Sequence, residues 1–121
     1  MKNQMTAAQA GRITAEMKQV AKDERVNVRE LLESVAGGKA VILANNRHRN
    51  LAPKGVGTGL SVKVNANIGT SPERVNVREE LRKLRLAREA GADAVMDLST
   101  GGDLDKIRKI IIHEAGIPIG T

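Results

Sequence analysis

Two stretches of the chain alternate apolar and polar residues as a β-strand does and then end in a polar cluster. The first, SVKVNANIGTS at 61–71, ends in asparagines and a glycine, and the second, ADAVMDLSTGGD at 92–103, ends in a similar cluster. The alternation predicts strands over 61–66 and 93–98. Because a segment with helical periodicity at 75–90 lies between them, we expect both polar clusters at the same edge of a parallel sheet.

The same order of elements continues toward the last residue. The pattern predicts a further helix over 103–115 and the beginning of a third strand over 117–120. Strand-helix-strand-helix-strand with crossovers of this length implies a right-handed parallel sheet. We expect an α/β fold containing a partial (β/α) barrel, although a doubly wound sheet would account for the pattern almost as well. A whole barrel takes about 250 residues, so the chain is expected to hold only its first part.

The residues before this segment are predicted to be rich in helix. Capping residues and helical spacing indicate a short helical turn or an arm at 6–13, a helix at 15–25 capped by Thr14, a helix from the cap Asn27 to Gly37, a strand at 39–43 and a long loop at 44–60. We therefore expect an N-terminal α-rich segment at 1–58 and the first βαβαβ units of a (β/α) barrel at 59–121.

Composition narrows the possible chemistry. The chain has no cysteine, which excludes thiolate catalysis, iron-sulfur ligation and cysteine zinc sites within it, and two histidines are too few to indicate a metal site. It has no Phe, Tyr or Trp, so it lacks the platforms on which nucleic-acid bases stack. No signal peptide and no run of membrane-spanning length is visible, so we expect a cytoplasmic protein without a membrane partner.

The net charge of +6 comes mainly from the first half of the chain. Its densest basic patch, RHRNLAPK at 47–54, has three cations, one histidine and no acid. Such a patch could attract nucleic acid or a phosphorylated ligand. A solvated basic loop explains it more simply, so nucleic-acid binding is the weakest hypothesis for this chain.

The polar strand ends are the candidate site. Strand alternation places Asn65 and Asn67 on one side, where their amides could donate to and accept from a heteroaromatic base, a ribose or a carboxylate. An asparagine-rich turn before a helix is the equally simple alternative. At the second strand end, Asp103 as helix cap would occupy the donors that a phosphate needs. Met96 by itself is typical of packing, and no serine, histidine and acid arrangement indicates a hydrolase.

The motifs KVNANIGTS and GADAVMDLSTGGD, preceded by MTAAQAGRITAEM, AVILAN and NLAPKGVG, resemble the N-terminal part of the phosphomethylpyrimidine synthase family. The resemblance covers essentially the whole chain. It implies a radical S-adenosylmethionine carbon-carbon lyase of thiamine biosynthesis that converts aminoimidazole ribotide to hydroxymethylpyrimidine phosphate. By the same resemblance, Asn67 and Met96 match substrate-binding positions: Asn67 would hydrogen-bond the ribotide and Met96 would give an apolar contact.

The family's other functional groups have no counterpart in this chain. The resemblance implies a [4Fe-4S] cluster on three cysteines and zinc on two histidines, and the residues that would hold them are absent here. We therefore expect no cofactor or metal bound by this chain, no catalytic residue, and no turnover by this chain alone. We also expect a homo-oligomer or a complementing chain, because an open sheet exposes strand edges. The alternative is a small α/β binding or self-association module, a diverged or redesigned fragment.

Overall fold

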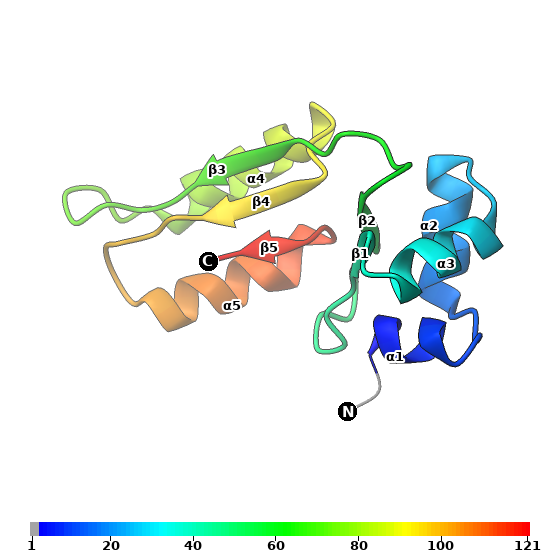
Figure 1. Cartoon of the computed structure of the whole chain (residues 1–121). Coiled ribbons are helices and arrows are strands. Elements are labelled where there is room, and N and C mark those ends of the chain that lie inside the picture. Colours follow the sequence, from blue (N-terminus) through cyan, green and yellow to red (C-terminus); the bar gives the residue numbers. More distant parts are fainter. Residues whose placement is uncertain (1–2) are drawn as a thin grey trace. The chain divides into compact units, whose positions relative to one another are not determined.

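The computed structural model describes residues 3–121, which form two compact units (Figure 1). The first unit contains the chain up to Ala44 and Pro53–Val62, and the second contains Asn45–Ala52 and Lys63–Thr121. Over the described residues the fold is mixed α/β, with five helices and two small sheets. None of these helices is both long enough and apolar enough to cross a membrane.

Three helices and a two-stranded sheet build the first unit. The helices are α1 (Gln4–Gln9), α2 (Ala15–Glu24) and α3 (Val28–Ala36), and the strands are β1 (Ala40–Leu43) and β2 (Lys54–Gly57). Capping residues define the helix starts, since the Thr14 side chain accepts a hydrogen bond from Met17 N at 3.1 Å. The first helix begins earlier than the predicted turn at 6–13, because Asn3 and Thr6 cap it reciprocally.

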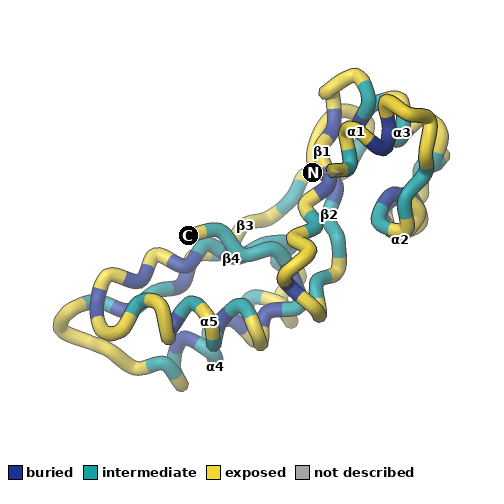
Figure 2. The backbone as a smooth tube through the Cα atoms, turned by 90° about the horizontal axis from the view of Figure 1, so that it is seen from below, coloured by how far each residue is buried: buried dark blue, intermediate teal, exposed yellow. Residues whose placement is uncertain are grey.

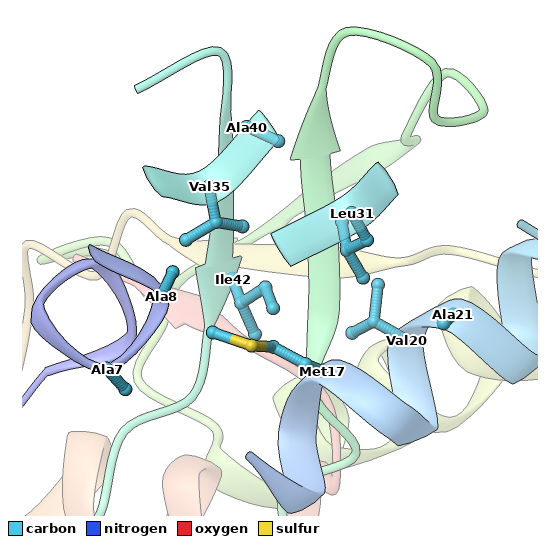
Figure 3. Packing of buried hydrophobic residues seen from close by; sticks show 9 residues of the cluster. All are labelled: Ala7, Ala8, Met17, Val20, Ala21, Leu31, Val35, Ala40 and Ile42. Atoms are coloured by element: carbon cyan, nitrogen blue, oxygen red, sulfur yellow. The ribbon is translucent and has the colours of Figure 1, made fainter. Parts of the chain in front are cut away.

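Side chains from all three helices and β1 converge in one core (Figure 3). Its centre is aliphatic, with Met17 and Val20 of α2 and Val35 of α3 at most 2% exposed. Since the chain has no aromatic residue, methionine supplies the long, adaptable side chain that fills this core.

The predicted loop over 44–60 is wrong at Lys54–Gly57, where β2 pairs antiparallel with β1. Two glycines weaken the local strand signal of this segment, so the pairing depends on β1 and not on propensity. Gly57 lies directly opposite Ala40 with a φ of 139°, and a Cβ there would meet the backbone of Lys39 and Ala40. His48, in the predicted basic patch at 47–54, is buried, so that patch is not a uniformly solvated loop.

The second unit is a three-stranded parallel sheet with two helices. Its elements are β3 (Asn65–Ile68), α4 (Val77–Glu89), β4 (Ala94–Asp97), α5 (Leu104–Ala115) and β5 (Ile119–Gly120), and the strands lie in the order β3-β4-β5. The side chains of Asn76 and Asp103 cap the two helices, and Gly116 ends α5 in the left-handed conformation. Buried residues recur every four positions along both helices and are separated by more exposed ones, as amphipathic helices require (Figure 2).

One face of this sheet packs against both helices. We call it the core face; it contains Ala66, Ile68, Val95, Asp97 and Ile119. Val95 is fully buried and packs with Leu84 of α4 and Ile111 of α5 in a single aliphatic cluster. Both crossover helices therefore cover the same side of the sheet.

The first parallel strand begins later than predicted. The alternation predicted a strand over 61–66, but β3 starts at Asn65, where pairing with β4 starts. Val62 and Val64 continue the alternating pattern, yet they are 92% and 58% exposed, so they contribute nothing to a core. As a result Asn65 and Asn67 lie within β3, and the polar cluster begins inside the strand and not after its last residue.

Candidate functional site

The sheet face opposite the helices carries both residues predicted to bind substrate. We call it the open face; it contains Asn65, Asn67, Ala94, Met96 and Gly120. Asn67 of β3 and Met96 of β4 are register partners across the parallel pair, so their Cα atoms lie side by side. Asn67 is exposed and Met96 is half-buried. The structure therefore brings together an amide and a thioether that are far apart in the sequence.

Asn65 and Asn67 lie on the same side of β3, as strand alternation predicted. The Asn65 Nδ2 atom donates a hydrogen bond to Asn67 Oδ1 at 3.2 Å. Both side chains are exposed on the open face. The bond occupies one acceptor position of Asn67 and leaves both of its amide protons available to a ligand.

A glycine on β5 makes room for Met96. Gly120 is the register partner of Met96, and a Cβ at this glycine would lie 2.9 Å from Met96 Sδ and 3.0 Å from its Cε. Those distances are too short for real atoms, so any larger residue at 120 would displace the thioether. Gly120 therefore allows Met96 to lie across the sheet toward β5.

Hydrogen bonds join the two loops at the carboxyl ends of β3 and β4. Thr70 N donates to Ser99 Oγ at 3.1 Å, and the Thr70 hydroxyl donates to the carbonyl of Gly101 at 2.7 Å. Thr70 and Ser99 are both buried. Buried polar groups that are mutually satisfied hold one backbone arrangement, so the two strand ends form a fixed edge, as the parallel arrangement predicted.

Asp97 supports this edge from the core face. Its Oδ1 atom accepts hydrogen bonds from the backbone and hydroxyl of Ser99, at 3.0 and 2.5 Å. The residue is only 4% exposed, and within residues 3–121 no group bonds its Oδ2 atom. Because Asp97 points to the opposite face from Met96, it orders the loop after β4 without lining the open face.

Glu80 of α4 fixes the end of β3. This carboxylate is 4% exposed; its Oε2 accepts from Gly69 N at 2.7 Å, and its Oε1 lies 2.7 Å from Lys83 Nζ. Gly69 has a φ of 155°, and a Cβ there would lie 2.6 Å from the backbone carbon of Leu98. The helix thus anchors the backbone two residues after Asn67, at a point where only glycine fits between the two strand ends.

Replacing Glu80 with alanine is expected to destabilise the second unit by about 1–3 kcal/mol, because Gly69 N and Lys83 lose a buried acceptor. Glu80→Gln keeps an acceptor oxygen and should lose less. Urea unfolding followed by far-UV circular dichroism measures both variants, since the chain lacks the aromatic residues needed for fluorescence. Equal losses in the two variants would show that the bond to Gly69 is not the stabilising contact.

The sequence did not indicate Glu80 or Gly120 as parts of this region. Glu79 and Glu80 are adjacent in the first turn of a charged helix, and only the packing of α4 buries the second of them. A signal for Gly120 did exist, because a glycine inside a predicted strand often marks close approach by another group.

The cluster and the zinc that the family resemblance implies do not fit the donors in this chain. No cysteine is present to supply thiolates. In the part of the chain that the structure describes, no three His, Asp or Glu side chains are grouped to hold a metal ion. The open face instead offers an amide, a thioether and a glycine surface, which suit an organic ligand.

The chain is similar over almost its whole length to known phosphomethylpyrimidine synthases. It is 54% identical to the enzyme of Carboxydothermus hydrogenoformans over 118 residues and 56% identical to that of Desulforudis audaxviator over 119; each alignment covers 98% of this chain. The Thermus thermophilus enzyme is 55% identical over 119 residues. The chain spans about 28% of the length of the first two relatives.

A family model gives the same result. The model described as the radical SAM ThiC family matches residues 3–121. Together with the relatives, this match confirms the resemblance that the strand motifs indicated. The chain belongs to the radical SAM ThiC family.

Proposed function

We propose that this chain supplies the first strands of a ribotide-binding site in a phosphomethylpyrimidine synthase of thiamine biosynthesis. The ligand would be aminoimidazole ribotide, bound against the open face. The observation that carries the proposal is the side-by-side position of Asn67 and Met96 in the β3-β4 register. Two residues that the resemblance assigned to one ligand lie next to each other on a face that the helices leave uncovered.

The arrangement of the second unit supports a partial (β/α) barrel over a doubly wound sheet. Its three parallel strands follow one another in chain order, β3-β4-β5. Both crossover helices pack against the core face. A doubly wound sheet reverses its strand order and carries helices on both faces, whereas a barrel keeps all its helices outside and its other face inside. The open face would then be the barrel interior.

The chemistry of the open face suits a small heteroaromatic ribotide. Asn67 offers amide donors, and the polarisable thioether of Met96 provides a soft apolar surface for a flat ring. Gly120 has no side chain, so it leaves space beside Met96. A few polar groups on an otherwise apolar wall are typical of sites that orient a small ligand.

We further propose that this chain binds but does not catalyse. Radical formation from S-adenosylmethionine requires an iron-sulfur cluster on cysteine thiolates, and this chain has no cysteine. The role of its residues would be to hold and orient the ribotide. Turnover of aminoimidazole ribotide by this polypeptide alone, after iron-sulfur reconstitution, would overturn this part of the proposal.

Replacing Asn67 with alanine is expected to weaken the binding of aminoimidazole ribotide by about tenfold, because a polar ligand atom loses its partner. Asn67 is exposed, so the fold should be unaffected. Isothermal titration calorimetry measures the dissociation constant, and far-UV circular dichroism checks the fold.

The control for this experiment is Gln9→Ala, which removes an exposed amide from α1 in the first unit. This variant should bind the ribotide as tightly as the unaltered chain. If Asn67→Ala also binds with unchanged affinity, Asn67 does not contact the ligand. If the unaltered chain shows no binding, the proposed role of the chain fails as a whole.

A further inference from the structure

We infer that Gly120 is a positioning residue for Met96: because it has no side chain, the thioether lies against β5 and presents its sulfur and methyl group to the ring of the ligand. This inference rests on the proposed function, because it concerns the same ligand on the same face. It identifies a residue outside the pair that the resemblance indicated. It also assigns one part of the ligand to Met96, namely the flat imidazole ring.

The space above Gly120 is taken up by Met96. Position 120 belongs to the open face, because Ile119 before it packs against the aliphatic cluster on the core face and side chains alternate along a strand. A Cβ there would lie 2.9 Å from Met96 Sδ and 3.0 Å from Met96 Cε. Among the described residues, apart from the two chain neighbours of Gly120, no other heavy atom lies within 4 Å of that point. The thioether therefore occupies the place where a side chain at 120 would stand.

The backbone gives no other reason for a glycine at this position. Gly120 is not among the glycines with a positive φ, so its conformation is open to residues with a side chain. Glycine within a strand is also destabilising relative to alanine, because it loses more conformational freedom on folding. Gly69 differs, since a Cβ there would meet the backbone of the neighbouring strand end. Gly120 thus makes room for the end of one flexible side chain, and Gly69 makes room for backbone.

The placement of the thioether decides what a ligand on the open face would meet. Met96 is unbranched, so its sulfur and methyl group can move when a neighbour requires it. With a methyl group at 120, the end of the side chain would leave β5 and rise from the sheet beside Asn67, its register partner. A ring bound next to Asn67 would then lose its favourable contact with the sulfur and collide with the displaced side chain.

Replacing Gly120 with alanine is expected to raise the dissociation constant for aminoimidazole ribotide about tenfold. The stability of the chain should be unchanged or slightly higher, because only a flexible side chain has to move. Isothermal titration calorimetry and urea unfolding measure the two quantities. The matched control is Gly37→Ala, which adds the same methyl group in the first unit and should leave the affinity unchanged. An unchanged affinity in Gly120→Ala would overturn the inference.

The same substitution in a Met96→Ala chain separates positioning from direct contact. Without the thioether, a methyl group at 120 displaces nothing, so the dissociation constant should change by less than about twofold in that background. A tenfold loss that persists there would overturn the inference. It would mean that residue 120 acts on the ligand or on the sheet directly.

A further measurement needs no ligand, so it separates a failure of this inference from a failure of the proposed function. The methyl signals of carbon-13-labelled methionines are recorded by nuclear magnetic resonance in the full chain, and the Met96 signal is the one that Met96→Ala removes. We expect Gly120→Ala to shift this signal and to leave that of Met17, buried in the first unit, in place. An unmoved Met96 signal would overturn the inference whether or not the ribotide binds. A shifted signal together with no ribotide binding by the unaltered chain would instead overturn the proposed function.

Discussion

Replacing Gly101 with alanine is expected to lower the free energy of unfolding of the second unit by about 3 kcal/mol. Gly101 is buried, and a Cβ there would collide with backbone atoms of Ser71 and Pro72. Backbone cannot rotate away as a side chain can, so the loops after β3 and β4 would have to separate. That movement would also strain the bond from the Thr70 hydroxyl to the Gly101 carbonyl.

Urea unfolding measures this loss through the nuclear magnetic resonance signals of the α5 amides, which lie in the same unit as Gly101; the signals of the α3 amides report on the control. The matched control is Gly37→Ala at the end of α3. There φ is −82°, and the nearest atom to a new Cβ is Glu33 O at 3.3 Å. The control should change stability by less than about 1 kcal/mol. A Gly101→Ala chain as stable as the control would contradict the close contact between the two loops.

Replacing Ile111 with alanine is expected to cost about 2–5 kcal/mol. Ile111 is fully buried between the sheet and α4, in the cluster that also contains Val95 and Leu84. Because the core contains no aromatic ring, the surrounding aliphatic side chains are short and can fill the resulting cavity only partly.

The neighbouring residue provides the control for Ile111. Ile112 has the same side chain in the same helix but is only partly buried, so Ile112→Ala should cost clearly less. Thermal and urea unfolding of both variants measure the difference. Similar losses at the two positions would show that α5 does not pack through Ile111 as described.

Apart from the first helix, the helix ends were predicted to within two residues, because their signals are local. Thr14, Asn27 and Asp103 cap their helices through their own side chains, within three residues along the chain. Gly116 ends α5 for a reason equally visible in the sequence, since glycine adopts a positive φ without steric cost. Such features need no knowledge of the rest of the fold.

Strand pairing was predicted less well because it depends on distant residues. The β2 strand contains two glycines and forms only because β1 is available to pair with it. Conversely, Val62 and Val64 have strand-like alternation but lie before Asn65 and Ala94, the first register pair of β3 and β4. Alternation describes a possible strand, and the partner decides where that strand starts.

The candidate site also combines features that the sequence predicted with features that depend on distant residues. Alternation placed Asn65 and Asn67 on one side of β3, and their side chains do contact each other. The register that brings Met96 next to Asn67 was not visible in the sequence, because the packing of α4 and α5 under the sheet sets it. Burial of Glu80 against Gly69 depends on the same packing.

Because Met96 lies over Gly120 and is only half-buried, we expect oxidants to alter the open face. Met17 is fully buried in the first unit and is shielded, whereas Met96 is only half-buried. Conversion of its sulfur to the sulfoxide would add a polar oxygen to a side chain that already fills the space above the glycine. The apolar wall beside Asn67 would become polar and crowded. A single oxygen atom could therefore alter the open face while both cores stayed intact.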